Sequence, residues 1–254
     1  MPSDPIPSAA LDFTLQVERL YAALMRTAAT PSDEEPSLGG KLLYAGELSP
    51  QGRALLVAGN IAGAASLAVT ADPVAQKLAI RDGVADFLVT SLDEALRILK
   101  NEIRKRETVA VCVALASEAI ERAMLERGVL PDLLPATALE AAESKRPVVR
   151  WRVASAPALW LPKLDAIALD CLMEDADANA PAARRWLRLA PRYLGRLAQG
   201  LRLLGCAPAV AKQFKARVEA AVRRGEIAVE VEIALSPGEE VFRFHPPTSS
   251  VPHP

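Results

Sequence analysis

The side chains best suited to acid–base or nucleophilic chemistry are scarce in this chain of 254 residues. It has two histidines, His245 and His253, and three cysteines that lie far apart in the sequence. With only two histidines and no Cys-x-x-Cys pair, metal sites and histidine-based proton transfer are strongly limited. Cys112, Cys171 and Cys206 each fall in an apolar stretch. They are predicted to be reduced, buried core residues rather than reactive thiols.

Two charged stretches in the second half of the chain are further candidates. An acidic stretch lies between residues 165 and 177 and lacks the glycine-bearing loop of a calcium site, so it is predicted to be a solvated helix end and loop. A basic band follows at helical spacing and predicts a solvent face with ion pairs, or a contact with an acidic partner. No catalytic residue and no metal ligand is assigned. The acidic stretch holds Asp165, Asp170, Glu174, Asp175 and Asp177, and the band holds Arg184, Arg185, Arg188, Arg192 and Arg196.

The composition is that of an ordinary soluble protein, with 51% apolar and 24% charged residues. A net charge of −1 argues against a nucleic-acid partner that is bound through its phosphates. No apolar run reaches the ~18 residues that span a bilayer. The first residues, Met1-Pro2-Ser3-Asp4-Pro5, lack the pattern of a signal peptide. A cytoplasmic protein without nucleic-acid or membrane partners is therefore expected.

Short apolar runs alternate with helical patterns between residues 39 and 134, which indicates an α/β fold with a mainly parallel sheet. Ser49-Pro50 and Asp72-Pro73 each combine an N-cap residue with a proline at the first helical position, and Ser91 with Glu94 forms a capping box. Gly59 and Gly63 in the first of these helices allow a close approach to the sheet. The strands are predicted at 41–45, 65–70, 85–90 and 109–114, with a fifth strand or its stub at 129–134.

The remaining segments are predicted from apolar spacing. A helix at 8–27 precedes a polar, proline-bounded linker at 30–36, and residues 1–7 are expected to be disordered. Beyond Pro135 we expect a strand at 147–154 and helices at 157–173, 182–204 and 208–224. A C-terminal hairpin follows, with alternating apolar residues from 227 to 235 and a partner strand at 241–245. The predicted units are residues 1–36 (helix and linker), 37–146 (α/β domain), 147–246 (helical region with hairpin) and 247–254 (loose tail).

Residues 39–134 resemble the dinucleotide-binding domain of urocanase (urocanate hydratase). The resemblance rests on Gly40-Lys41-Leu42, Gly46, Arg81-Asp82-Gly83, the run from 92 to 97 and the run from 127 to 132. It implies a Rossmann-like domain, a tightly held NAD that acts as an electrophile, a hydro-lyase activity and a homodimer. The catalytic cysteine motif of the family is not found in this chain.

The resemblance also indicates where a cofactor would lie and where the chain departs from the family. The glycine-rich phosphate loop of the family is replaced by Gly46-Glu47-Leu48-Ser49-Pro50-Gln51-Gly52-Arg53. Proline removes one amide donor and Glu47 adds a negative charge near the phosphates. Thr70 stands where the family has a ribose-binding acid, with Asp72 close by as a helix cap. If the site is retained, the cofactor-binding positions are Gly46, Ser49, Gln51, Gly52, Arg53, Thr70, Asp72 and Ala116.

These departures favour a urocanase-like protein that has lost hydratase activity and acts as a binding or scaffolding module. We expect it to form a homodimer and to hold no cofactor, or NAD if the family site is retained. The alternative is an enzyme or sensor that binds NAD(H) or another small nucleotide through a remodelled loop.

Overall fold

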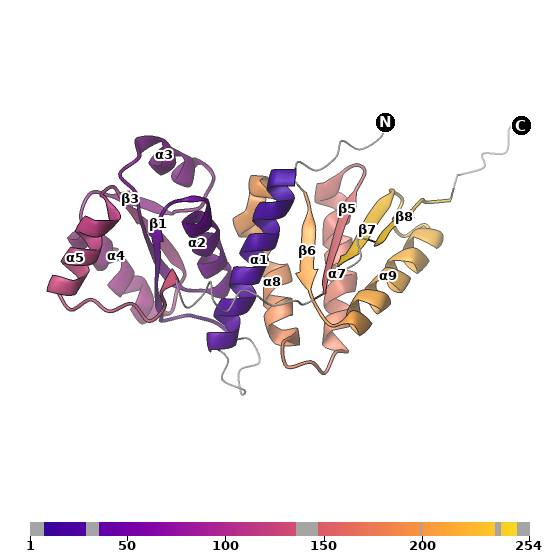
Figure 1. The fold of residues 1–254 in the computed structure, drawn as a ribbon. Helices are drawn as coiled ribbons and strands as arrows, with labels where there is room; N and C mark the ends of the chain where they lie inside the picture. Colours follow the sequence, from indigo (N-terminus) through magenta and orange to yellow (C-terminus); the bar gives the residue numbers. More distant parts are fainter. Residues whose placement is uncertain (1–7, 29–35, 136–146, 199, 237–239, 248–254) are drawn as a thin grey trace, which may run out of the picture.

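The computed structural model describes residues 8–28, 36–135, 147–198, 200–236 and 240–247. The predicted disordered lead at 1–7 lies outside these residues, as do nearly all of the linker at 30–36 and of the tail at 247–254. Within the described residues the chain forms two four-stranded sheets with helices around them (Figure 1). The predicted α/β fold class is confirmed.

The first sheet, sheet A, is parallel and has the strand order β1-β2-β4-β3. A single parallel bridge between Leu43 and Leu133 adds the predicted fifth element as a stub beside β1. Strand β3 is short and forms the opposite edge of the sheet. The strands are β1 (Leu42–Glu47), β2 (Ala65–Val69), β3 (Phe87–Val89) and β4 (Val109–Val113).

The helices of this half begin where their caps predict. The side chains of Ser49, Asp72 and Ser91 each accept a hydrogen bond from an amide in the first turn of the following helix. Successive residues of each strand point to opposite faces of sheet A. One face packs against α2 and the other against α4 and α5, so that helices cover both faces. The helices are α2 (Pro50–Ala62), α3 (Pro73–Arg81), α4 (Leu92–Lys105) and α5 (Ser117–Glu126).

The second sheet, sheet B, is antiparallel and has the order β6-β5-β7-β8. The predicted hairpin is confirmed as β7 and β8, and Val231 and Ile233 on its inner face are fully buried. Trp151 on β5 is 1% exposed and its ring lies 4.8 Å from the ring of Phe214. The elements of this half are β5 (Val148–Val153), α7 (Pro157–Met173), α8 (Ala180–Leu194), the 3-10 turn η1 (Gly195–Leu197), β6 (Arg202–Gly205), α9 (Pro208–Arg223), β7 (Val231–Ser236) and β8 (Glu240–Phe244).

Helix α1 (Ser8–Ala28) lies between the two sheets, against α2 on one side and against β6 and α8 on the other (Figure 1). Its Tyr21 hydroxyl donates to the carbonyl of Ala182 at 2.7 Å. Arg185 on α8 donates from Nε to the carbonyl of Ile61 at the end of α2, at 3.0 Å. One continuous buried cluster therefore runs from Leu43 on β1 to Ile233 on β7.

The structure corrects the predicted helix at 182–204. The helix ends at Leu194, and residues 202–205 instead form β6, which pairs with β5. Gly195 and Gly200 have φ angles of +41° and +80°. Because glycine adopts positive φ without steric cost, these two residues allow the chain to leave the helix and turn into a strand.

Both charged stretches differ in part from their predicted solvent-facing roles. The side chain of Asp165 is only 13% exposed and forms an ion pair with Nε of Arg202 at 3.0 Å, and its partial burial raises the pKa of its carboxyl group. Arg184 and Arg185 donate to main-chain carbonyls, those of Leu172 and Ile61. Among the described residues no group of histidines, cysteines or acids is arranged to hold a metal ion.

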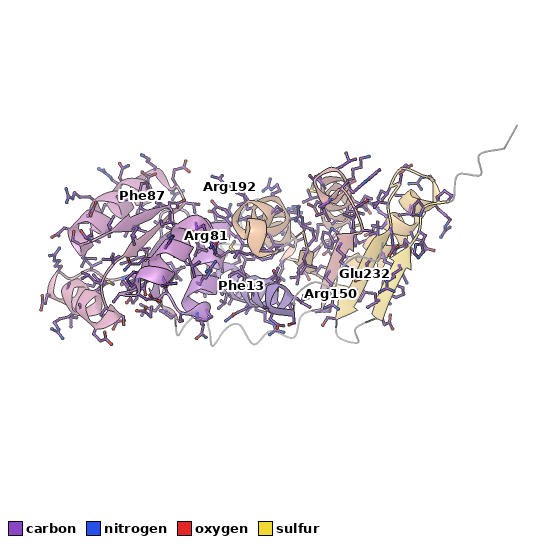
Figure 2. All side chains as sticks on the ribbon, turned by 90° about the horizontal axis from the view of Figure 1, so that it is seen from above. Phe13, Arg81, Phe87, Arg150, Arg192 and Glu232 are labelled. Carbon is purple, nitrogen blue, oxygen red and sulfur yellow. The ribbon has the colours of Figure 1, made fainter. Side chains whose placement is uncertain are left out.

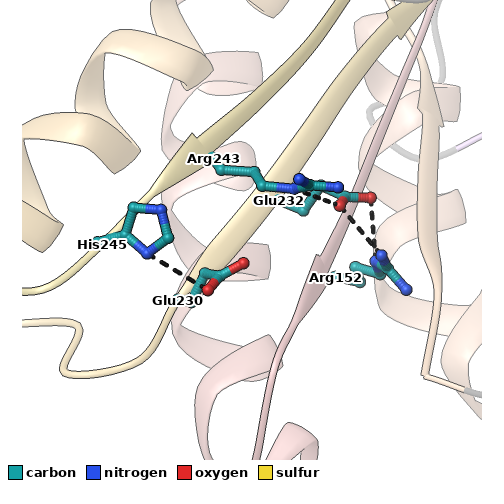
Figure 3. Close-up of polar contacts among 5 residues, drawn as sticks. All are labelled: Arg152, Glu230, Glu232, Arg243 and His245. Atoms are coloured by element: carbon teal, nitrogen blue, oxygen red, sulfur yellow. Dashed lines mark hydrogen bonds and ion pairs between the residues drawn. The ribbon is translucent and has the colours of Figure 1, made fainter. Parts of the chain in front are cut away.

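The outer face of the hairpin carries ion pairs rather than a reactive histidine. Glu232 accepts from Arg152 at 3.0 Å and from Arg243 at 3.2 Å, and Nδ1 of His245 lies 3.3 Å from Glu230 (Figure 3). His245 is thus a hairpin residue with a carboxylate neighbour. No helix in the described part of the chain is long and apolar enough to cross a bilayer.

Candidate functional site

The predicted cofactor positions come together at the carboxyl edge of sheet A. Gly46 lies at the end of β1, Thr70 follows β2 directly, and Ala116 follows β4 and precedes α5. Ser49, Gln51, Gly52 and Arg53 occupy the start of α2, and Asp72 caps α3. Carboxyl ends of parallel strands are where open α/β sheets bind ligands, so the candidate site has the expected location.

The loop from β1 to α2 donates most of its amide hydrogens within the chain. The amide of Leu48 donates to the carbonyl of Val69 at 2.8 Å, and that of Ser49 to the carbonyl of Glu47 at 2.8 Å. Ser49 Oγ accepts from the amide of Gly52 at 3.2 Å. Pro50 has no amide hydrogen. Of the residues from 48 to 52, Gln51 therefore contributes the remaining amide.

The two glycines kept in this loop have different structural roles. Gly46 has a φ angle of +75°, and a methyl group placed on its Cα would lie 3.6 Å from Cγ of Pro135. Gly52 lies directly against β1, and a Cβ atom there would come within 2.0 Å of the carbonyl oxygen of Glu47. Gly52 thus allows the helix to start in contact with the strand.

Arg53, a cation of the predicted site, is bound elsewhere. Its Nη2 lies 2.5 Å from Oδ2 of Asp82 at the end of α3, and this aspartate also accepts from Arg81 at 2.9 Å. The side chains of Arg53 and Asp82 are 20% and 15% exposed. A guanidinium group held in this way ties the start of α2 to the residue that ends α3 and is withheld from a phosphate.

Thr70 and Asp72 are also hydrogen-bonded to their own loop. Thr70 is 1% exposed, its Oγ1 accepts from the amide of Asp72 at 3.3 Å, and its carbonyl accepts from Gln76 at 3.0 Å. Oδ1 of Asp72 accepts from the amide of Val74 at 2.9 Å. Asp72 therefore has the capping geometry that the Asp-Pro pair predicts.

Acidic groups gather around the end of β1. The hydroxyl of Tyr44 donates to Glu121 of α5 at 2.9 Å. Burial raises the pKa of Tyr44 most, followed by the hydrogen bond to Glu121 and the nearby charges of Glu47 and Glu118. The Tyr44–Glu121 pair has no signature in the sequence, because its partners lie far apart in the chain and meet only through the sheet. This edge of the sheet is electrostatically unfavourable for an anion.

The three cysteines are free and buried, as predicted. Burial, reinforced by the charge of Glu47, raises the pKa of Cys112 to about 11. Burial also raises the pKa of Cys171. Since the thiolate is the nucleophilic form of cysteine, Cys112 and Cys171 are poor nucleophiles at neutral pH.

The Arg53–Asp82 ion pair should make the stability of the fold depend on pH in the acid range. Hydrogen bonds from Arg81 and then Arg53 hold the pKa of Asp82 below its usual range. The folded state therefore binds this proton more weakly than the unfolded chain, so the pair stabilises the fold above the ordinary carboxyl pKa of about 4. This contribution is lost as the pH falls through the lowered pKa.

We expect Asp82→Asn to lower the free energy of unfolding by about 1 kcal/mol at neutral pH, and by much less in acid, where the wild-type carboxylate is itself protonated. Urea unfolding at both pH values measures the difference. The matched control is Asp93→Asn, which removes an exposed ion pair with Arg127 and should cost only a few tenths of a kcal/mol. An equal loss for Asp82→Asn at both pH values would contradict the assigned role of the pair.

The parallel sheet, with helices on both faces and a glycine-bearing strand-to-helix turn, defines this half of the chain as a Rossmann-like domain. Residues 18–139 match the family model described as the Urocanase Rossmann-like domain. Over 98 residues the chain is 30% identical to the S-methyl thiourocanate hydratase of Variovorax sp. (strain JCM 16519 / RA8). That alignment covers 39% of this chain and 18% of the relative. The predicted resemblance to the dinucleotide-binding domain of urocanase is confirmed.

Proposed function

We propose that this protein is a urocanase-like binding or scaffolding module that does not hydrate urocanate and holds no resident NAD. The observation that carries the proposal is the hydrogen bonding of the loop after β1. The amides of Leu48, Ser49 and Gly52 already donate to acceptors of the chain, and Pro50 has none to offer. A Rossmann diphosphate is bound by amides of this loop and by the helix N-terminus, so this loop offers few free donors.

The charges at the same edge of the sheet support the proposal. Two like charges ~4 Å apart repel by roughly 4 kcal/mol at an effective dielectric of 20, which is close to a thousandfold in affinity. Glu121, Glu47 and Glu118 each lie close enough to the Tyr44 phenol to raise its pKa, so the end of β1 carries several negative charges. Arg53 does not offset them because it is paired with Asp82.

Isothermal titration of the purified protein with NAD, ADP-ribose and urocanate tests the proposal. We expect no saturable heat with any of the three compounds at millimolar concentration. Glu47→Gln removes the carboxylate that lies within the loop and leaves the loop amides in their hydrogen bonds. Because the amides remain occupied, this variant should also fail to bind NAD. Stoichiometric binding of NAD by the wild-type protein, or NAD copurifying with it, would contradict the proposal.

A second candidate function is a nucleotide-binding enzyme or sensor with a remodelled loop. The left-handed backbone at Gly46 and the contact of Gly52 with β1 favour it, because Rossmann dinucleotide loops use glycines for these two purposes. For this candidate, titration with ADP-ribose should give saturable heat that is lost in Gly46→Val.

The homodimer is proposed on the edge of sheet B. Strand β8 is the last strand of that sheet, and Val241 on it is 47% exposed. Exposed strand edges pair readily with a second copy. Light scattering at micromolar concentration should return twice the mass of the chain, and a monomer at that concentration would remove the dimer from the account.

A further inference from the structure

A cleft of about 850 Å³ lies at the opposite end of sheet A from the loop after β1. Its floor includes Phe87 and Val109, which are the first residues of β3 and β4. One wall is the C-terminal half of α4, and Arg192 and Tyr193 from the end of α8 close the other side. Phe87 and Arg192 lie on the same side of the molecule in the view of Figure 2. The volume falls in the range of small-molecule sites.

Both carboxylates of this cleft accept hydrogen bonds from groups of the protein. Oδ2 of Asp86 accepts from the amide of Ala110 at 2.8 Å. Oε1 of Glu102 accepts from Asn101 at 2.6 Å and from Lys105 at 2.9 Å. Glu102 is paired with a lysine, and among the described residues neither carboxylate forms an ion pair with an arginine of the cleft.

Two arginines of the cleft lack such partners. Arg104 on α4 and Arg192 on α8 are exposed, and neither forms an ion pair with a carboxylate among the residues that the structure describes. Arg97, also in the lining, uses Nε to bind the carbonyl of Asp93 at 3.3 Å. Guanidinium groups bind carboxylates and phosphates through paired N–H donors, so the cleft is complementary to an oxyanion.

The apolar part of the cleft is open to solvent at Phe87. Phe87 is 47% exposed at the edge of sheet A, and Ile98 and Tyr193 extend the apolar lining. Aromatic side chains stack on flat rings in offset or edge-to-face arrangements. A ligand that fits this lining therefore combines a ring with an anionic group.

Arginines in the last turn of a helix also interact favourably with its negative end, and Arg104 and Arg192 both occupy such positions. This interaction explains why each helix ends with an arginine. It does not explain why the arginines of two separate helices line the same cleft, beside an exposed phenylalanine. We propose that this cleft binds a small ligand that carries a carboxylate or phosphate group on a flat apolar ring. The site is separate from the loop after β1 and does not depend on the proposed function.

Titration of the full chain, followed by ligand-observed NMR, tests the proposal with three probes: cinnamate, phenyl phosphate and inorganic phosphate. At least one aromatic anion should bind saturably, and Arg104→Gln and Arg192→Gln should each weaken it about tenfold. Arg122→Gln, which changes an exposed arginine of α5 outside the cleft, should bind as the wild-type protein does. Preference for cinnamate or for phenyl phosphate identifies the anionic group.

Phe87→Ser separates the ring contact from the charge contact. This variant should weaken both aromatic probes and leave the weaker binding of inorganic phosphate unchanged. Thermal unfolding of each variant shows that it is folded. The proposal is overturned if neither aromatic anion binds at millimolar concentration, or if Arg122→Gln weakens binding as much as the two cleft variants do.

Discussion

Gly52→Ala is expected to destabilise the protein by about 3 kcal/mol or more, a loss typical of severe overpacking. In an open helix the same change would stabilise by up to ~1 kcal/mol, because alanine has the higher helix propensity. Here the new Cβ would lie 2.0 Å from the carbonyl oxygen of Glu47 and 3.3 Å from that of Ala45. Both atoms belong to the backbone of β1, so α2 would have to move away from the strand.

Urea unfolding of Gly52→Ala measures this loss, and Gly83→Ala is its control. Gly83 has a φ angle of +66° and no atom within 4 Å of its Cβ position. Its substitution should therefore cost only the energy of placing alanine in a left-handed conformation, about 1 kcal/mol. A Gly52→Ala protein as stable as the wild type would show that the glycine is not needed for packing, and a phosphate-binding role would regain support.

Trp151→Ala is the second large expected effect, with a loss of about 4 kcal/mol. Trp151 is 1% exposed on β5, the strand that pairs with both β6 and β7, and it packs on Phe214 of α9. Because the buried cluster continues through α1 and α8 into the parallel half, both halves should lose stability together. Unfolding curves recorded with a probe in the parallel half and with a probe in the C-terminal half should show the same fall in midpoint.

Trp160→Ala provides the matched control for this prediction. Trp160 is partly exposed on α7 and lies beneath the ammonium group of Lys163, 4.3 Å from the ring centroid. Its removal should cost no more than about 1 kcal/mol. Similar losses for the two tryptophan variants, or a fall in the midpoint of the C-terminal half alone, would contradict the continuous core.

Local signals in the sequence predicted much of the fold. Ser49-Pro50, Asp72-Pro73 and Ser91 each mark a helix start that the structure confirms through a side-chain hydrogen bond. These patterns are reliable because a cap satisfies amides only a few residues away. The close approach expected at Gly59 is also present, since a Cβ there would lie 2.5 Å from Leu43 of β1.

Structural features that depend on contacts between residues far apart in the chain could not be predicted from such local patterns. Residues 202–204 continue a helical apolar pattern, and only their pairing with β5 makes them a strand. Asp165 was predicted to belong to a solvated helix end and loop, but the fold largely covers its side chain beside Arg202. Such tertiary contacts override local propensity because burial and pairing energies exceed the few tenths of a kcal/mol that separate helix from strand preferences.

The candidate site shows the same division. Asp72 was predicted as a helix cap from its neighbour Pro73, and its bond to the amide of Val74 agrees. That Arg53 is held by Asp82, and that Pro135 lies against Gly46, could not be read from the sequence because each contact joins residues brought together by the sheet. The resemblance to urocanase indicated the candidate positions, and the structure shows the hydrogen bonds and ion pairs that their side chains form.

Amide NMR shifts of the wild-type protein during titration with NAD test most directly whether the loop from Gly46 to Arg53 serves the fold rather than a dinucleotide. We predict that the amide chemical shifts of Leu48, Ser49 and Gly52 do not change at millimolar NAD, because each of these amides already donates its hydrogen within the chain. Saturable shifts of these three amides with a common dissociation constant would contradict the account.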